Sequence, residues 1–175
     1  FVTIPNSLSL NITANALTLE AWVNPGIDLG PGVGPLEYMS IMNKGSYGIT
    51  FNRDQGGTIS GVAKSGDTWN DVKTVVSWKA GEWHHIAMSY DGKENRLYID
   101  GVLKDTVVAS GNADDSSDKS LIIGASYQMH WGWTGKIDEV RVLNRALSAP
   151  EIEHDAKFSL RELDGNKATH SFLKN

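Results

Sequence analysis

The sequence predicts an all-β domain made of antiparallel strands, and two of its features lead to that prediction. Short runs of apolar and polar residues alternate with a period of two and end at Gly, Asn or Asp, which is the pattern of antiparallel sheet. One such run ends at Asp100-Gly101, a dipeptide favoured in type I′ hairpins because both turn residues need positive φ. A chain of 175 residues without cysteine is large enough to bury a core as one domain without disulfides.

Seven segments have the composition or alternation of strands. In chain order they are residues 1–5, 17–23, 86–90, 97–99, 102–108, 121–124 and 137–143. In the second segment, Leu17, Leu19, Ala21 and Val23 fall on one face, while Trp22 falls on the other. Because both faces carry apolar residues, we expect this strand to be central in its sheet and covered on both sides.

One short helix is expected after the last strand. Ser148 can cap it, Pro150 is tolerated in its first turn, and Glu151 completes a capping box. We expect the helix to end near Lys157, so that residues 1–157 form the domain. Residues 158–175 form a tail without a clear period, which could either pair with a sheet edge or lie on the surface.

Composition excludes several classes of partner and chemistry. The net charge is −5 and no Lys/Arg cluster stands out, so nucleic acid and anionic membrane are not expected as partners. No apolar run approaches the ~20 residues that span a bilayer, so membrane insertion is not expected. No charged-then-apolar leader opens the chain. The lack of cysteine excludes a thiolate zinc site and a cysteine nucleophile.

Several phrases follow one another in a recognisable order. They are Leu-Glu-Ala-Trp-Val at 19–23, Glu-Trp-His-His-Ile-Ala at 82–87, Tyr-Asp-Gly at 90–92, Leu-Tyr-Ile-Asp-Gly at 97–101, Gly-Lys-Ile-Asp-Glu-Val-Arg-Val at 135–142 and Asn-Arg-Ala-Leu-Ser at 144–148. This order resembles the laminin-G-like branch of the concanavalin A-like superfamily over about residues 1–152. The resemblance implies a two-sheet antiparallel jelly-roll sandwich, which binds ligand on loops at one rim or on its concave sheet. It also implies an extracellular or cell-surface location.

The loop that joins the last two expected strands is the first candidate for ligand binding. It carries Tyr127, Gln128, His130, Trp131 and Trp133. An aromatic ring can stack on the C–H face of a pyranose while nearby polar groups bond its hydroxyls, so we expect a polysaccharide or other glycan as the ligand. For Trp133 the alternative is a place in the core, before the following strand.

Trp69 and Asn70 form a second aromatic and amide cluster, which we expect in a loop after residues 64–67. This cluster could face the first one across a groove. The alternative is a hairpin tip with a buried indole.

Calcium is the metal that the sequence favours, as a structural ion. It takes six to eight oxygen ligands from carboxylates, amides and backbone carbonyls. The resemblance places such an ion near Asp138, and Asn15 is a candidate amide ligand. Phe1-Val2-Thr3-Ile4-Pro5 already reads as strand, so the family's preceding strand and its Phe-Asp-Gly turn, which supply other ligands, are expected to be missing. The acidic run 114–118 lacks the glycine and terminal glutamate of an EF-hand loop and is expected to be solvated.

The sequence does not predict an enzyme. Retaining glucanases of the superfamily use two glutamates about 5 Å apart in a Glu-x-Asp-x-x-Glu strand, whereas this chain has Lys136 and Arg141 at those positions. His84 and His85 are neighbours on an expected strand, so they point to opposite faces and cannot simply chelate one ion.

Two functions remain open from the sequence. The first is a non-catalytic, lectin-like module of a secreted or cell-surface protein, with flanking domains and calcium support. The second is an interaction, adhesion or spacer module without a glycan ligand. Exposed aromatic side chains in the 127–133 loop would favour the first function, and burial of both tryptophans would favour the second.

Overall fold

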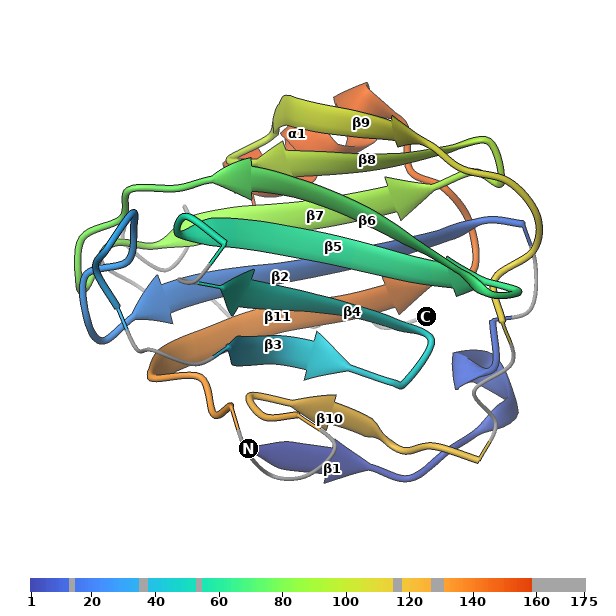
Figure 1. Ribbon diagram of the computed structural model, residues 1–175, viewed down its shortest axis with the longest axis horizontal. Helices are drawn as coiled ribbons and strands as arrows, with labels where there is room; N and C mark the ends of the chain where they lie inside the picture. Colours follow the sequence, from blue (N-terminus) through green and yellow to red (C-terminus); the bar gives the residue numbers. More distant parts are fainter. Residues whose placement is uncertain (13–14, 35–37, 53–54, 115–117, 127–130, 159–175) are drawn as a thin grey trace.

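The computed structural model describes residues 1–12, 15–34, 38–52, 55–114, 118–126 and 131–158. In this part of the chain, two antiparallel sheets pack face to face as a jelly-roll sandwich with a short helix after the last strand, as predicted (Figure 1). Within the described ranges, no helix has the length and apolarity that a membrane crossing requires.

Among the described residues, one sheet has six strands and the other has five. In spatial order, the six-stranded sheet contains β1 (Val2–Ile4), β10 (Leu121–Ile123), β3 (Met39–Asn43), β4 (Tyr47–Asn52), β5 (Thr58–Ser65) and β6 (Thr68–Val75). The five-stranded sheet contains β11 (Gly135–Leu143), β2 (Leu17–Pro25), β7 (His84–Tyr90), β8 (Glu94–Ile99) and β9 (Val102–Val108). A 3₁₀ turn, η1 (Leu8–Leu10), and the helix α1 (Ala149–Phe158) complete the elements.

The hairpin and helix signals in the sequence are confirmed. Asp100 and Gly101 have φ of 52° and 77°, the positive values that a type I′ turn requires. Ser148 donates its backbone N–H and its hydroxyl to Glu151 Oε2, both at 2.8 Å. The helix ends at Phe158, one residue beyond the predicted end.

Four strands of the six-stranded sheet, β3 to β6, were not predicted individually. A register shift between Ser40 and Met42 interrupts the alternation of β3. Gly48 and Gly61 weaken the pattern of β4 and β5 because they present no side chain. The expectation that Trp69 lies in a loop is wrong, since β6 begins at Thr68 and forms a hairpin with β5.

Strand β2 is central and buried on both faces, as predicted. It lies between β11 and β7. Its inner face belongs to the core between the sheets, which includes Leu19 and Val23. On the outer side of the same sheet, Ile152 of α1 packs with Ala87 and Tyr98.

Hydrogen bonds join the segment before α1 to this outer face. Thr18 Oγ1 accepts from the Leu147 N–H and donates to the Arg145 carbonyl, both at 2.8 Å. Ser89 Oγ donates to the Leu147 carbonyl at 3.0 Å. These side chains satisfy backbone groups that would otherwise be buried without partners.

The two sheets approach each other closely at Gly61. A Cβ atom at this position would lie 2.7 Å from Cγ and 2.8 Å from Cβ of Met88 on the opposite sheet. Real Cβ atoms do not approach so closely, so the strand can pass over Met88 only because residue 61 is glycine.

We therefore expect Gly61→Ala to lower the free energy of unfolding by about 1–3 kcal/mol, as overpacking of a core does. Gly26→Ala is the matched control, because its Cβ would meet nothing closer than 3.4 Å; it should change stability by less than about 0.5 kcal/mol. Urea unfolding of both variants measures the difference. Equal stabilities would show that the sheets separate without cost at this point.

Candidate functional site

One end of the sandwich gathers the loops that the sequence predicts for ligand binding. Strands β2, β4, β6 and β10 finish there, and β3, β5, β7 and β11 begin there. This end, which we call the rim, lies at the left of Figure 1. Its described parts are residues 26–34, 38, 55–57, 76–83, 124–126 and 131–134.

Two exposed aromatic rings lie together at the rim. The ring centroids of Trp131 and Tyr38 are 5.0 Å apart and their planes are inclined by 41°. The two residues are 41% and 37% exposed. Paired rings that remain this accessible offer apolar surface to a ligand instead of to the core.

The backbone holds Trp131 in place. Its carbonyl accepts the Ser40 N–H at 2.8 Å, and Ser40 and Gly132 form a parallel bridge beside β3. Trp131 has a φ of +56°, in the left-handed region that non-glycine residues seldom adopt. Backbone strain of this kind persists where the surrounding structure determines it, and it is concentrated at functional sites.

Polar side chains lie beside the aromatic pair. Gln55 Nε2 is 3.5 Å from the Tyr38 hydroxyl, and Lys73 Nζ donates to Gln55 Oε1 at 3.1 Å. The Gln55 N–H is bonded in turn to Asn52 Oδ1 at 3.2 Å. The rim thus combines an apolar surface with amide, hydroxyl and ammonium groups, which is the chemistry that an uncharged polyhydroxylated ligand requires.

The structure separates the residues of the predicted aromatic loop. Trp131 is exposed, whereas Trp133 is half-buried, packs against the core and donates its Nε1–H to the Lys136 carbonyl at 3.2 Å. Trp133 therefore takes the core alternative. Tyr127, Gln128 and His130 lie outside the described residues.

The second predicted cluster does not face the first. Trp69 and the rim lie at opposite ends of β6, because Trp69 pairs with Lys64 while Val75 pairs with Thr58. Trp69 is 54% exposed, which contradicts a buried indole at the hairpin tip.

Asn70 is buried, so the prediction that its side-chain amide binds a ligand is wrong. It is 5% exposed, and its Nδ2 donates to the Ala63 carbonyl at 3.1 Å. Because alternate residues of a strand point to opposite faces, Asn70 faces the interior while Trp69 faces outward.

The two predicted calcium ligands are far apart. Asp138 pairs with Trp22, whereas Asn15 precedes Leu17; Leu17 and Trp22 alone are separated by roughly 16 Å of strand. Asp138 Oδ1 also accepts the Glu139 N–H at 2.8 Å. The described residues contain no group of three His, Asp or Glu side chains arranged to hold a metal. Asp138 and Asn15 therefore do not fit a shared ion, and calcium binding stays a prediction.

The two neighbouring histidines have separate surroundings. His84 stacks on Trp78, with ring centroids 4.3 Å apart, and its Nδ1 is 3.0 Å from Asp100 Oδ2. His85 lies beside Trp22 on the outer face of the sheet, at 5.3 Å between ring centroids. The prediction that they do not chelate one ion agrees with these positions.

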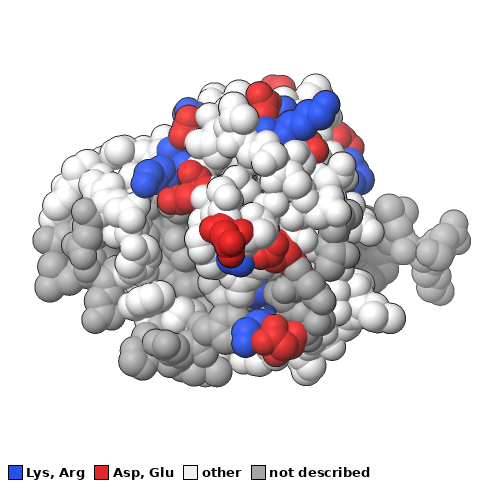
Figure 2. Space-filling view, turned by 45° about the vertical axis from the view of Figure 1, so that its right-hand side comes forward, with Lys and Arg blue, Asp and Glu red and all other residues white. Residues whose placement is uncertain are grey.

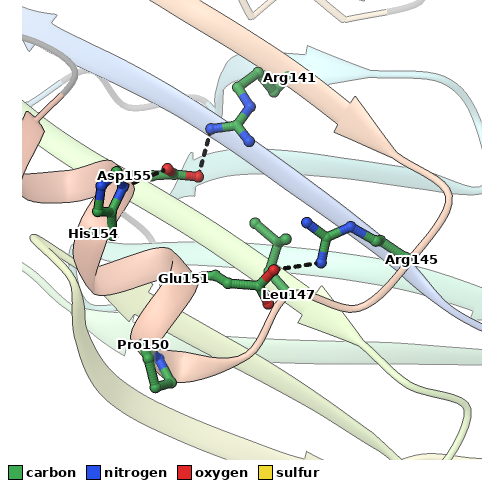
Figure 3. A pocket seen from close by; sticks show the side chains of 7 residues that line it. All are labelled: Arg141, Arg145, Leu147, Pro150, Glu151, His154 and Asp155. Carbon is green, nitrogen blue, oxygen red and sulfur yellow. Dashed lines mark hydrogen bonds and ion pairs between the residues drawn. The ribbon is translucent and has the colours of Figure 1, made fainter.

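A hollow lies between α1 and the five-stranded sheet. It has a volume of about 350 Å³, and Figure 3 shows its lining, with Arg141 facing Asp155 and Arg145 facing Glu151. Arg141 Nη1 lies 2.5 Å from Asp155 Oδ2 and 3.2 Å from Oε2 of Glu20, a residue that is only 1% exposed. The charged groups are paired with one another, so the cluster joins the helix to the sheet.

Burial shifts the pKa values of two groups beneath this hollow. Burial raises the pKa of Glu20 to about 7, although the Arg141 guanidinium acts in the opposite direction. Burial lowers the pKa of His85 to about 4. His85 Nε2 lies 3.7 Å from Glu20 Oε1, so both groups favour their neutral forms in the same buried space.

Sequence reasoning missed Tyr38 and Gln55. Tyr38 follows a proline- and glycine-rich segment and directly precedes a strand, where an aromatic residue usually indicates core. Only the pairing of Ser40 with Gly132 reveals that Tyr38 lies beside Trp131. Charged side chains do not mark a site on the face that Figure 2 presents, because acidic and basic residues are interspersed there.

Comparison with known proteins identifies the architecture. A family model described as the concanavalin A-like lectin/glucanases superfamily matches residues 1–153. No curated protein sequence matches the chain.

Solved structures share the fold at low identity. A heptameric pentraxin from Limulus polyphemus has a TM-score of 0.61 and 12% identity, over 88% of this chain and 80% of that one. Domain 4 of an extracellular arabinanase from Geobacillus stearothermophilus, solved with arabinotriose, has a TM-score of 0.57 and 20% identity, over 88% and 71%. A Bacteroides ovatus protein with a proposed carbohydrate-binding role has a TM-score of 0.65 and 19% identity, over 86% of this chain and 43% of that one.

The opposed pKa shifts predict how stability depends on pH. Glu20 has a folded pKa above its unfolded value of 4.5, so its contribution is fully present below pH 4.5 and is lost as the pH rises through about 7. His85 has a folded pKa below its unfolded value of 6.5, so its contribution is present above pH 6.5 and is lost as the pH falls through about 4. Between pH 4.5 and 6.5 the two effects oppose each other.

We expect Glu20→Gln to leave the His85 effect alone, so that the free energy of unfolding rises by up to about 1 kcal/mol per pH unit from pH 4.5 to 6.5. Urea unfolding at pH 4.5, 5.5 and 6.5 measures this slope. Glu151→Gln is the control, because hydrogen bonds from Ser148 lower the pKa of Glu151 to about 2, below the window. Identical slopes for wild type and Glu20→Gln would contradict the prediction.

Proposed function

Since the chain belongs to the concanavalin A-like lectin/glucanases superfamily, we propose that it is a non-catalytic carbohydrate-binding module that holds a polysaccharide at the rim. The observation that carries this proposal is the exposed pair of Trp131 and Tyr38. Two of the structural neighbours also support it: the arabinanase domain was solved with arabinotriose, and the Bacteroides ovatus protein has a proposed carbohydrate-binding role.

The geometry of the pair suits a sugar ring. Because the two planes are inclined by 41°, a pyranose or furanose stacked on one ring has its edge against the other. Gln55 and Lys73 extend hydrogen-bonding groups from the same side, within reach of sugar hydroxyls. The backbone bond to Ser40 limits the freedom of Trp131 before binding, which reduces the entropy cost of association.

The charged residues support a binding role over a catalytic one. Arg141, where the glucanases have a catalytic glutamate, is paired with Glu20 and Asp155 beneath the helix. Lys136, at the other glutamate position, lies at the start of β11. The nucleophile and acid/base pair of a retaining glycosidase is replaced by two basic residues.

The proposed biological setting follows from the same chemistry. A shallow aromatic site retains a polymer instead of enclosing a small molecule, so the module would hold a larger secreted or cell-surface protein on a glycan. Calcium support is part of the proposal only as a condition to be tested, because Asp138 and Asn15 do not share a site.

The test is a binding screen with trisaccharides and matching linear polysaccharides, beginning with arabinotriose and arabinan and with xylotriose and xylan. We expect Trp131→Ala and Tyr38→Ala each to raise the dissociation constant at least tenfold, a loss of about 1.4 kcal/mol. Val108→Ala, which alters an 88% exposed apolar residue on β9, is the control and should bind as the wild type does. Calorimetry in calcium and in chelator provides the measurement.

Binding that survives both aromatic substitutions would place the ligand elsewhere. A wild-type protein that binds no glycan of the panel, with or without calcium, would overturn the proposal in favour of a protein-interaction or spacer role.

A further inference from the structure

Trp69 presents a second aromatic surface, well separated from the rim. Its side chain is 54% exposed, and the Lys64 ammonium lies 5.8 Å from the centroid of its ring. Lys64 and Trp69 are cross-strand partners on β5 and β6. An ammonium near an indole face is attracted by the ring quadrupole, which favours one orientation of the two side chains.

The Lys64 ammonium is fixed from its other side. Lys64 Nζ donates to Asp114 Oδ2 at 2.7 Å, and Asp114 Oδ1 accepts the Gly66 N–H at 2.6 Å. The Asp114 backbone is tied down too, because its N–H donates to the Lys64 carbonyl at 2.8 Å and its carbonyl accepts from Ser46 Oγ at 2.9 Å. The Trp69 surface is therefore pre-organised by a network that spans the β5–β6 hairpin and the segment after β9.

Trp69 and Tyr38 lie on the same face of the molecule. Met39, Ile59, Ala63 and Val72 belong to the core between the sheets. Because side chains alternate along a strand, Tyr38, preceding Met39, and Trp69, three residues before Val72, both belong to the outer face of the six-stranded sheet. This is the face toward the viewer in Figure 1.

The two aromatic surfaces are separated by a distance that a linear polymer spans. Trp69 and Val75 lie at opposite ends of β6, roughly 20 Å apart along the strand. Strands β3 and β6 are three positions apart in the sheet, about 14 Å across. The diagonal from Tyr38 to Trp69 is therefore about 24 Å.

The residues between them leave a path for a glycan. Thr50, Val62 and Asp71 are half-buried outward-facing residues of β4, β5 and β6. Thr50 and Asp71 supply hydroxyl and carboxylate groups, and Lys73 Nζ lies 3.7 Å from Asp71 Oδ2. Large side chains stand at the two ends of this path and smaller ones lie between, an arrangement that suits a chain laid obliquely across the strands.

We infer that Trp69 is a second contact for the same linear polysaccharide, so that one polymer chain runs from Trp131 and Tyr38 at the rim to Trp69 at the far end of β6. This inference rests on the proposed carbohydrate-binding function. Two contacts on one chain act at a high effective concentration, so affinity rises with chain length. A trisaccharide at the rim is too short to gain from Trp69.

The experiment compares Trp69→Ala with the wild type on arabinotriose and linear arabinan, and on xylotriose and linear xylan. We expect the substitution to leave the trisaccharide dissociation constant within twofold and to weaken binding of the matching polysaccharide at least fivefold. Trp69→Phe, which keeps an aromatic face, should retain most of the affinity for polysaccharide. Leu103→Ala, a 49% exposed residue of the other sheet, is the matched control and should change neither.

The outcomes separate this inference from the proposed function. Polysaccharide affinity unchanged in Trp69→Ala, with both ligands lost in Trp131→Ala, would overturn the second contact and leave the rim site standing. Equal losses for trisaccharide and polysaccharide in Trp69→Ala would also overturn it, because Trp69 would then belong to the primary site. A wild type that binds none of the four ligands would count against both.

Discussion

The burial of β2 on both of its faces is the constraint on which the rest of the structure depends. Its inner face fills the space between the sheets. Its outer face is covered by the segment before α1, where Thr18 bonds to the Arg145 carbonyl and the Leu147 N–H, and by Arg141, which pairs with the buried Glu20. The five-stranded sheet therefore offers little free surface near its centre. The exposed rings of Tyr38, Trp131 and Trp69 lie instead at the rim and on the outer face of the six-stranded sheet. Under the proposed function, one sheet serves stability and the other serves recognition.

The same burial explains why ionisable groups collect beneath the helix. Glu20 points outward from β2 into a space closed by Arg141 and Asp155. A buried carboxyl is costly when charged, and here the cost is limited because its pKa rises toward neutrality while an arginine stays within reach. His85 stays neutral in the same space. The cluster is thus a tether for α1, even though unusual pKa values in a hollow can also indicate catalysis.

The tryptophan side chains differ in burial and therefore in the role that each can have. Trp133 packs against the core and satisfies its indole N–H with a backbone carbonyl. Trp131 is held by a backbone pairing that leaves its ring exposed. Trp69, at the far end of β6, has a cation–π contact with Lys64, which is itself ion-paired with Asp114. Both exposed rings are fixed by neighbours instead of by burial, which keeps them ordered and available to a ligand.

The sequence by itself determined the features that depend on local chemistry. Alternation identified β2 and β7, the Asp100-Gly101 dipeptide identified the turn between β8 and the returning strand β9, and the capping box of Ser148 and Glu151 identified the start of α1. Motif order identified the family. Only the tertiary structure decided the site, because strand pairing joins residues that are distant in the chain. The bridge between Ser40 and Gly132 brings Tyr38 to Trp131, and the length of β6 separates Trp69 from both. No local pattern records such pairings, since each depends on which strand edges meet when the two sheets close.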